Sequence, residues 1–259
     1  SNIGASNKVP LGIEFELKDG WKNYWRNPGD AGYPPEINFG NNENLSEIKW
    51  FWPAPKRFIF EDMQNFGYEK KIIFPITATV KTTKEPLVLQ ANITALACKD
   101  ICVPIDGDLN LTIPVGNPVK TEHAASIYSF EKRVPTKATW PGFKILSVNA
   151  NKNSILIKVK SKHPLIKPDV FIESENGFRF GKPEVSISNN RLNASFILSN
   201  DIPIDTNLAG IPITITVVDG KKSIEVRRSI RGKLVTKPVQ SYTSFNWLTV
   251  LLAALIGGL

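Results

Sequence analysis

Apolar and polar residues alternate along most of the 259-residue chain. Alternation of this kind predicts half-buried β-strands, because successive side chains of a strand point to opposite faces of its sheet. In the first half, the pattern predicts strands at 11–17, 35–39, 45–52, 71–80, 86–97 and 108–114. Residues 27–35 (NPGDAGYPP) are dense in proline and glycine, so neither a regular helix nor a central strand is expected there.

The pattern changes near residue 120. Residues 120–133 carry apolar side chains at roughly helical spacing, and Pro135 and Pro141 follow. A short helix and a proline-marked linker are therefore predicted over 120–141. This linker separates a first domain, residues 1–119, from a second domain, residues 142–232, and both have an ordinary size for a domain.

The second half returns to the pattern of short strands. The predicted strands are 143–149, 154–160, 169–174, 178–187, 191–198, 211–218 and 222–230. Asp219-Gly220 is a strong hairpin signal and Asn189-Asn190 marks another turn. About seven short strands in about 100 residues indicate an immunoglobulin-like sandwich. The first half fits the same description with a longer aromatic insertion, so the predicted fold is all-β, with two tandem immunoglobulin-like β-sandwich domains.

The two ends of the chain predict a membrane connection. The start, SNIGASNKV, has no basic region followed by an apolar core, so no signal peptide is expected in it. The final residues, 247–259, carry no charge and are mostly apolar. Because a spanning helix needs about 20 apolar residues, this stretch is predicted to be the start of a transmembrane helix. Residues 233–246 would then form a tether.

Composition and charge limit the classes of function. A hydrophobic content of 42% with 22% charged residues is sufficient for packed cores and argues against wholesale disorder. The formal net charge is +8, but the basic residues lie in scattered doublets. This favours a solvated basic surface, with attraction to an anionic membrane face as an alternative, and no nucleic acid partner is expected because no motif accompanies the charge. Phosphate-binding loops, nucleophile elbows and zinc-protease motifs are absent from the sequence.

The remaining candidate chemistry lies in Cys98 and Cys102, which are the two cysteines of the chain. A disulfide needs Cα atoms about 4.4–6.8 Å apart, whereas residues four positions apart on a strand are about 13 Å apart. The chain must therefore curl between the cysteines if they are bonded. Lys99, Asp100 and Ile101 would then form the tip of a tight loop at the end of a strand.

The residues alone leave several roles for this pair open. A structural disulfide closing so short a loop would contribute about 2 kcal/mol in the chain-entropy model. A redox-active pair is the second option, since strained or exposed disulfides are easier to reduce. A structural zinc site usually needs four ligands, and His123 and His163 do not cluster with the cysteines. A soft Cu(I) site that includes Met63, or two unbonded thiols, would complete the list.

Four segments, taken in order, resemble one family. They are GWKNYWRNPGDAGYPP (20–35), WFWPAPKRF (50–58), FGY (66–68) and CKDICVP (98–104). They resemble the periplasmic amino-terminal region of the DsbD-like membrane thiol:disulfide interchange proteins, and most of all the branch of the suppressor-of-copper-sensitivity protein B (ScsB). The resemblance covers residues 12 to 105. The second domain matches only in position and strand pattern, and residue 247 falls where that family enters its transmembrane domain.

The resemblance implies a protein-disulfide reductase module at the periplasmic side of the bacterial inner membrane, working without a cofactor. Electrons would come from cytoplasmic thioredoxin through the transmembrane domain and a thioredoxin-like carboxy-terminal domain of the same full-length protein. The Cys98/Cys102 dithiol would pass them to a periplasmic thioredoxin-fold disulfide protein of the ScsC type. Cys102 is the expected attacking residue, because the family's second cysteine tends to be accessible. The better-known DsbD branch spaces its cysteines more widely than this chain does.

Other residues have candidate supporting roles. Phe66 and Tyr68, in a turn-like stretch, are candidates for a cap over the cysteines. Lys99 would favour a thiolate and Asp100 would oppose it. The aromatic segment could be sandwich core, or it could be a wall over the cysteines; its members are Trp21, Tyr24, Trp25, Trp50, Phe51 and Trp52.

Two further alternatives remain at this stage. Arg26 and Asp30 would either form an ion pair that holds the Pro-Gly loop or remain solvated. For the whole chain, the competing class of function is a non-catalytic protein-binding module, in which two sandwich domains on a membrane tether contain an inert structural disulfide.

Overall fold

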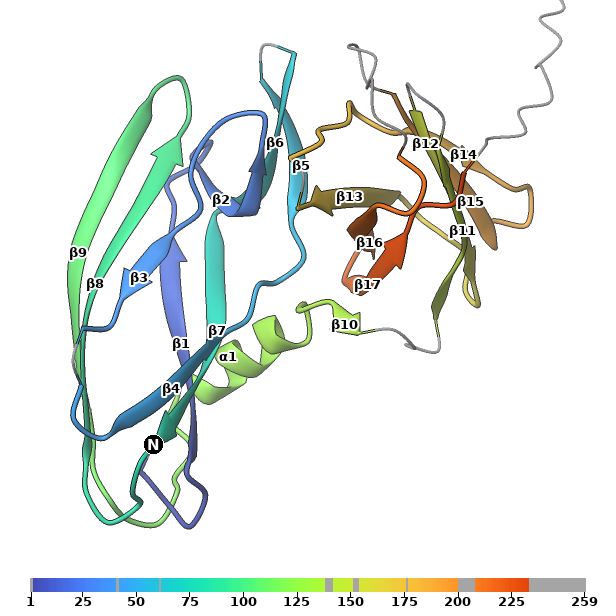
Figure 1. Ribbon diagram of the computed structural model, residues 1–259. Coiled ribbons are helices and arrows are strands. Elements are labelled where there is room, and N and C mark those ends of the chain that lie inside the picture. The colour runs from blue at the N-terminus through green and yellow to red at the C-terminus, as the bar shows by residue number, and fades with distance from the viewer. Residues whose placement is uncertain are drawn as a thin grey trace, which may run out of the picture.

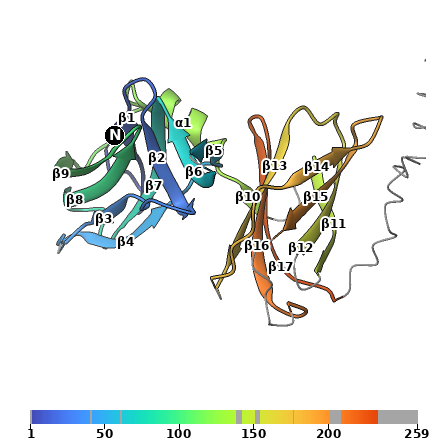
Figure 2. The same ribbon diagram turned by 90° about the horizontal axis from the view of Figure 1, so that it is seen from above.

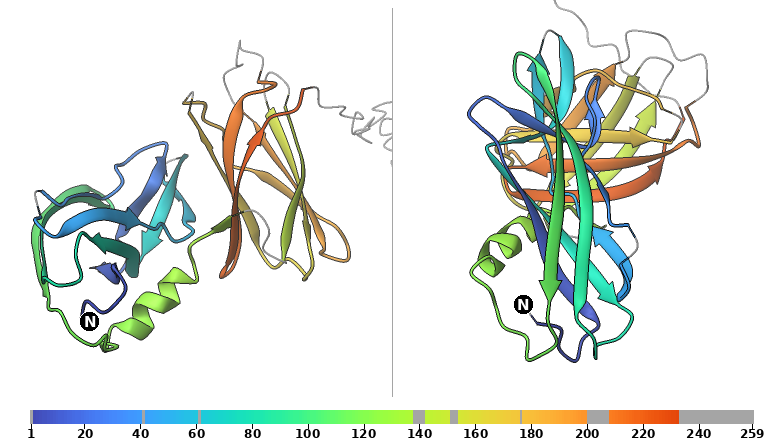
Figure 3. Two further views of the ribbon diagram at one scale, coloured as in Figure 1. Left: turned by 60° about the horizontal axis from the view of Figure 1, so that its bottom comes forward. Right: turned by 90° about the vertical axis from the view of Figure 1, so that its left-hand side faces the viewer.

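The protein has two mostly β domains joined by one short helix, as Figure 1 shows. The computed structural model describes residues 2–40, 42–60, 62–137, 142–150, 154–175, 177–199 and 208–232. The connecting helix is α1 (Ala124–Glu131), and a two-residue strand, β10 (Thr136–Lys137), follows it. The predicted linker helix is confirmed, and Figure 3 shows α1 leading from the first domain towards the second.

The first domain is a sandwich of a three-stranded sheet, β1-β7-β4, and a six-stranded sheet, β3-β8-β2-β6-β5 with β9 added beside β8. The bounds of its strands are β1 Lys8–Glu16, β2 Lys22–Gly29, β3 Glu36–Asn38, β4 Leu45–Trp50, β5 Lys56–Phe60, β6 Met63–Glu69, β7 Lys71–Val80, β8 Leu87–Cys98 and β9 Cys102–Ile113. Buried residues of both sheets meet in one core cluster, with Val9 and Ala78 from one sheet and Leu87, Leu89 and Ile113 from the other.

Several predicted strands of this domain are confirmed, but β2, β5 and β6 were not predicted, and β9 is longer than expected. The last strand begins at Cys102 and not at residue 108, because it pairs continuously with β8. Residues 63–69, expected to be turn-like, form β6 after a tight turn in which Asp62 has a φ of 67°. The strand β2 enters the proline-glycine stretch as far as Gly29, with a register shift after Tyr24 that accommodates the irregular sequence.

The second domain packs two four-stranded sheets, ordered β10-β17-β16-β13 and β11-β12-β15-β14. Its remaining strands are β11 Phe143–Ala150, β12 Ser154–Ser161, β13 Pro168–Ser174, β14 Glu184–Ile187, β15 Asn193–Ser199, β16 Pro212–Asp219 and β17 Lys222–Ser229. The predicted hairpin is confirmed, since Asp219 pairs with Lys222 and Gly220 has a φ of 64°. The predicted strand 178–187 is shorter than expected and covers only 184–187.

The expected tether (233–246), transmembrane start (247–259) and the last part of the linker (138–141) lie outside the described residues. Among the residues that the structure describes, no helix has the length and apolar character needed to cross a bilayer.

An aromatic contact joins the two domains. Phe171 on β13 is 1% exposed, and its ring lies 5.8 Å from the ring of Trp25 and 5.0 Å from that of Phe66. The guanidinium of Arg57 lies 4.8 Å from the Phe66 ring and 4.9 Å from the Phe171 ring. Edge-on aromatic pairs and arginine stacking of this kind each add to the energy of burying the rings.

Charged hydrogen bonds surround this contact. Arg57 of β5 donates to both carboxylate oxygens of Asp169, at 3.1 and 3.0 Å, and to the carbonyl of Val170 at 2.7 Å. Arg26 of β2 donates to Glu173 at 2.9 and 2.6 Å and also to Glu225. Such two-point pairs between arginine and carboxylate fix orientation as well as distance. These contacts place the second domain beside β2, β5 and β6, which Figure 2 shows from above.

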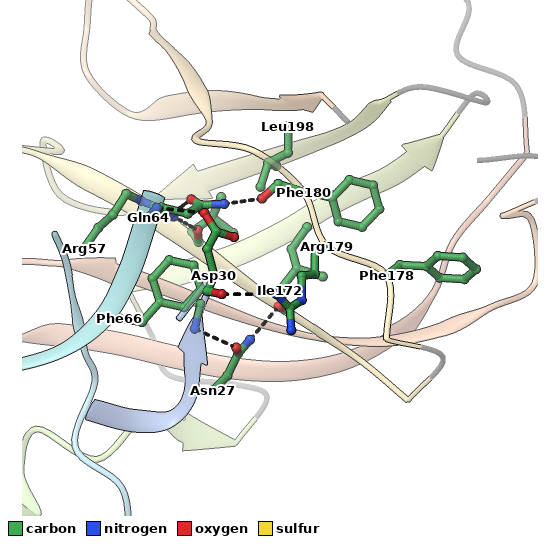
Figure 4. A pocket seen from close by; sticks show the side chains of 12 residues that line it. Asn27, Asp30, Arg57, Gln64, Phe66, Ile172, Phe178, Arg179, Phe180 and Leu198 are labelled. Atoms are coloured by element: carbon green, nitrogen blue, oxygen red, sulfur yellow. Dashed lines mark hydrogen bonds between the residues drawn. The ribbon is translucent and has the colours of Figure 1, made fainter. Parts of the chain in front are cut away.

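A small cavity of about 40 Å³ remains beside this interface. Gln64 spans it, accepting a hydrogen bond from Arg57 and donating one to the carbonyl of Phe180 (Figure 4). Arg179 donates to the carbonyl of Asp30 across the same gap, at 3.3 Å. The space is large enough for water and too small for a substrate.

The structure shows neither of the two alternatives for Arg26 and Asp30, an ion pair between them or solvated side chains. Arg26 turns to the two glutamates of the second domain, and the Asp30 carboxylate accepts from the backbone N–H of Gln64 at 2.8 Å. Burial alone would lower the pKa of Arg26, but the hydrogen bonds and charges of Glu173 and Glu225 outweigh burial and raise that pKa above its ordinary value. Sequence proximity suggested the wrong partner because the true partners lie 147 and 199 residues away.

We expect Arg26→Met to lower the free energy of unfolding by about 1–3 kcal/mol, because it leaves two partly buried glutamates facing each other. Equilibrium urea unfolding followed by tryptophan fluorescence would measure this, since Trp25 reports on the interface. The matched control is Arg227→Met, which removes an exposed pair with Glu175 and should change the same quantity by less than about 0.5 kcal/mol. Equal losses in the two variants would contradict the role assigned to Arg26.

Candidate functional site

The two cysteines close the tip of a long β-hairpin. Strands β8 and β9 pair without interruption from Leu87 opposite Ile113 to Cys98 opposite Cys102. A disulfide joins this last pair, whose Cα atoms are 4.1 Å apart. Three residues make the turn, in which the N–H of Lys99 donates to the carbonyl of Ile101 at 3.0 Å. The predicted curl and its tip are confirmed, and the continuous register of the hairpin produces them.

The two cysteines differ in their exposure to solvent. Cys98 is 8% exposed, whereas Cys102 is exposed. The difference follows from the position of each strand, because β8 has β2 on one side and β9 on the other, while β9 pairs with β8 alone among the described strands. An incoming group can therefore reach Cys102 from solvent and Cys98 only with difficulty.

The disulfide lies on the outer face of the six-stranded sheet. Directly opposed residues of neighbouring strands share a face. Lys22 of β2 is opposite Cys98 on one side and opposite Glu69 of β6 on the other. Lys22 and Glu69 are each half-buried, and the ammonium group of Lys22 lies 5.3 Å from the centre of the Phe58 ring. On this face, the residues beside the disulfide on β2 and β6 are therefore charged.

Phe66 and Tyr68 lie on the inner face of the sheet. Tyr68 is opposite Asn23, which is opposite Ala97, and this row faces away from the row of Cys98. Phe66 shares the face of Tyr68 because it is two residues away on the same strand, and both are 6% exposed. The prediction that these residues cap the disulfide is therefore wrong.

The contacts of these two aromatic residues show their role in the structure. The Tyr68 hydroxyl donates to the carbonyl of Pro53 at 2.7 Å, and its ring packs edge-on against Phe74 at 5.4 Å. Phe66 packs on Phe171 of the second domain at 5.0 Å. The sequence did contain a signal for this, since Phe66 and Tyr68 alternate with Asn65, Gly67 and Glu69, as apolar and non-apolar residues do in a half-buried strand.

The other residues expected near the pair lie at the exposed tip. Asp100 is exposed, and the aliphatic part of Lys99 lies against Gly20. A Cβ at Gly20 would be 3.0 Å from Lys99 Cε, and Gly20 has a φ of 83°, so glycine fits both the turn and the close approach. Lys99 is thereby drawn towards the turn that precedes β2.

Most of the aromatic segment is core, as one of the two alternatives predicted. Trp25 is fully buried and Tyr24 is 5% exposed. Trp50 and Trp52 are partly buried and stack with ring centres 4.9 Å apart beside Phe74. Two members differ, since Phe51 is 37% exposed and Trp21 is half-buried. Among the described residues, no group of three histidine, cysteine, aspartate or glutamate side chains is arranged to hold a metal ion.

The site is thus a disulfide between one buried and one exposed cysteine at the end of a β-hairpin. Comparison with known proteins gives the family. Residues 2–114 match the family described as "Thiol:disulfide interchange protein DsbD, N-terminal", so the first domain belongs to this family and the resemblance seen in the sequence is confirmed. Residues 133–233 match a family described as "Domain of unknown function (DUF8393)".

A solved structure has a similar fold. The "N-terminal periplasmic domain of ScsB from Proteus mirabilis" is similar to this chain with a TM-score of 0.69 and 22% identity, over 86% of this chain and 88% of that one. Two further solved structures have low similarity to this chain: a titin fragment, with 11% identity and a TM-score of 0.21, and the carboxy-terminal domain of a Streptococcus agalactiae AgI/II polypeptide, with 7% identity and a TM-score of 0.22. The match to the titin fragment covers 90% of this chain and 95% of the fragment. The match to the AgI/II domain covers 87% of this chain and 92% of that domain. No curated protein sequence matches this chain.

The burial of Tyr68 predicts a dependence of stability on alkaline pH. Burial raises the pKa of Tyr68 well above its ordinary value of 10.0, against the opposing charge of Arg26. Because the folded-state pKa is the higher one, the stabilisation is fully present below pH 10 and is lost as the pH rises towards the folded-state pKa. Tyr68→Phe should therefore lose less stability above pH 10 than the unmodified chain, by up to about 1.4 kcal/mol per pH unit.

The measurement is urea unfolding at pH values from 8 to 11. At pH 8 the same variant should be less stable by about 1 kcal/mol, because the hydrogen bond to Pro53 is lost. The matched control is Tyr33→Phe, since Tyr33 is 73% exposed and its removal should leave the pH dependence unchanged. An unchanged slope in Tyr68→Phe would contradict the prediction.

Proposed function

We propose that this chain is a periplasmic thiol–disulfide exchange module that passes electrons from a membrane-embedded reductase to disulfide-containing periplasmic partners. The observation that carries the proposal is the asymmetric Cys98–Cys102 disulfide at the tip of the β8–β9 hairpin, with one sulfur-bearing residue buried and the other exposed. The family of the first domain supports the same class of chemistry. No cofactor is needed, because the two thiols hold both electrons.

Hairpin geometry argues against an inert staple. The ladder of backbone hydrogen bonds already closes the loop between residues 98 and 102. A disulfide across so short a loop adds about 2 kcal/mol at most in the chain-entropy model. A sandwich domain of this size can be stable without such a disulfide. The competing function, a non-catalytic binding module, therefore leaves the position of the pair unexplained.

The exchange proceeds in two balanced steps. The Cys102 thiolate attacks one sulfur of the partner's disulfide, a bond forms between the two proteins, and the partner's other sulfur leaves as a thiolate. The Cys98 thiolate then attacks the Cys102 sulfur, which restores the internal disulfide and releases the partner's second thiolate. Two electrons pass to the partner, and the protons lost by Cys98 and Cys102 are available to its thiolates. Cys102 is proposed as the attacking residue because it is the exposed one.

The proposed partners follow from this chemistry and from the family. The acceptor is a periplasmic thioredoxin-fold disulfide protein of the ScsC type, and the donor is the thioredoxin-like and transmembrane part of the same full-length protein. The second domain is proposed to hold the first at a fixed orientation. We also infer that the second domain is immunoglobulin-like, because its sheets β11-β12-β15-β14 and β13-β16-β17 reproduce the strand order of a constant-type domain.

The reduction potential of the Cys98/Cys102 couple tests the proposed function. We expect a value of roughly −180 to −270 mV, the range of redox-active proteins, after equilibration in glutathione or dithiothreitol buffers with thiol trapping. A value below about −300 mV is typical of structural disulfides. Such a value would overturn the proposal in favour of the binding module.

Trapping with single-cysteine variants tests the order of attack. Cys98→Ser retains Cys102 and should accumulate a mixed disulfide with an oxidised thioredoxin-fold substrate, because no second thiol can resolve it. Cys102→Ser should accumulate about 10-fold less in the same time, since reactivity follows access to the sulfur. Non-reducing gel electrophoresis measures both. Preferential trapping through Cys98 would show that the assignment is reversed.

A further inference from the structure

One edge of the redox hairpin is unpaired. The strand β9 pairs with β8 along its whole length, and no other described strand borders it. Figure 1 shows β9 along the outer side of the first domain, with the second domain beyond the opposite end of the same sheet. This free edge begins at Cys102, the exposed cysteine.

The direction of the backbone groups on this edge follows from two observations. Antiparallel strands alternate between close pairs without mutual hydrogen bonds, about 4.5 Å apart at Cα, and bonded pairs about 5.5 Å apart. The 4.1 Å separation of Cys98 and Cys102 marks a close pair. Independently, the backbone of Gln90 on β8 forms two hydrogen bonds with the Asn42 side chain: the Gln90 N–H donates at 2.9 Å and the Gln90 carbonyl accepts at 3.3 Å. Asn42 lies on the side of β8 away from β9.

Both observations indicate that, at the even-numbered positions of the hairpin, the backbone N–H and C=O groups of β8 and of β9 point away from each other. The N–H and C=O groups of Cys102 and Asp106 therefore point away from β8, towards the free edge. Pro104 fits this alternation, because a residue without an N–H is tolerated where the ladder needs no donor. The exposed cysteine thus offers its own backbone donor and acceptor to an incoming chain.

We propose that the redox partner presents the segment around its reactive cysteine as an extended strand, which pairs with residues 102–108 of β9. The proposal deepens the proposed function and rests on it. A hydrogen-bonded pair formed at Cys102 would hold the two Cα atoms about 5.5 Å apart. Disulfides have Cα separations of 4.4–6.8 Å, most often about 5.5–6 Å. Strand addition therefore places a partner cysteine at the spacing that the mixed disulfide requires.

The direction of attack agrees with this arrangement. Thiol–disulfide exchange is an in-line displacement, so the entering and leaving sulfurs lie on opposite sides of the sulfur between them. Cys98 lies on the β8 side of Cys102. The entering or leaving partner sulfur must then lie on the other side of Cys102, over the free edge of β9, where the added strand would run.

The side chains along this edge indicate the chemistry of the partner segment. Asp106 and Asp108 are exposed on the face of the disulfide, in a chain whose net charge is +8. Val103 is 40% exposed on the opposite face. A partner strand with basic residues on the face of its cysteine and apolar residues on the other face would complement both rows.

A nine-residue probe peptide fits this description: acetyl-Lys-Val-Lys-Val-Cys-Val-Lys-Val-Lys-amide, with its cysteine linked to 5-thio-2-nitrobenzoate. The reduced chain attacks the peptide sulfur, thionitrobenzoate leaves and is measured by its absorbance, and the second cysteine then releases the peptide. The reference compound is N-acetylcysteine with the same leaving group. A second peptide is N-methylated at its cysteine and at the lysines two residues away, which removes strand pairing and keeps the side chains.

Proline substitutions on β9 test the edge itself. Asp106→Pro removes an outward N–H and leaves the ladder to β8 intact. The control, Thr112→Pro, removes an outward N–H at the same kind of position, about 33 Å along the strand from Cys102. Since Asp106→Pro also removes a charge, the N-methylated peptide, which keeps all side chains, tests the backbone contribution alone. Thermal unfolding of both variants checks that they fold, and the N-methylated peptide tests the proposal on the unmodified chain whether they fold or not.

We expect the peptide to react at least about 10-fold faster than the N-acetylcysteine compound, as two hydrogen bonds would allow. This advantage should disappear on N-methylation and in Asp106→Pro, and should remain in Thr112→Pro. A peptide that keeps its advantage when N-methylated, or that never has one, would overturn strand addition. The proposed function is judged separately, by the reduction potential, which does not depend on any peptide.

Discussion

The register of β8 within the six-stranded sheet is the constraint on which the site depends. Pairing with β2 on one side and β9 on the other buries Cys98, and the same pairing places Cys102 on a strand with a free edge. A shift of one residue would move both sulfurs to the inner face of the sheet, because side chains alternate along a strand. The chemistry of the pair is therefore set by backbone hydrogen bonds and needs no specialised side chain beside the sulfurs.

One edge of this sheet is covered by the second domain and the other, in the part of the chain that the structure describes, is not. At one edge, β5 and its neighbours β6 and β2 are covered by the second domain through Phe171 and the two arginine–carboxylate clusters. At the other edge, β9 remains uncovered among the described residues. An open edge exposes unpaired donors and acceptors, which is a hazard unless it serves as a binding surface. Pro104, Asp106 and Asp108 limit indiscriminate pairing on β9, because a missing N–H and repeated charge disfavour it.

The interface between the domains combines apolar burial with fully paired charge. Arg26 and Arg57 each bring a guanidinium close to aromatic rings and bond carboxylates of the second domain. Pairs of this kind are costly to bury alone, so their geometry defines one orientation more than it adds stability. The second domain contacts β2, β5 and β6, and β9 lies on the side of the first domain away from it (Figure 2).

The sequence by itself determined the all-β class, most strands, the linker helix and the importance of the two cysteines, because alternation, turn residues and rare residue types are local signals. It also predicted the tight loop, since the reach of a disulfide requires the chain to curl between residues 98 and 102. Only the tertiary structure decided which face each residue occupies and which distant residues meet. Phe66 and Tyr68 were candidates for a cap over the cysteines but lie on the inner face. For Arg26, a pair with Asp30 was one of two alternatives, but Arg26 bonds Glu173 and Glu225. The partners of Arg26 depend on the contact between the domains, which joins residues more than a hundred positions apart. The face of Phe66 and Tyr68 depends on strand register, which joins residues of different strands tens of positions apart.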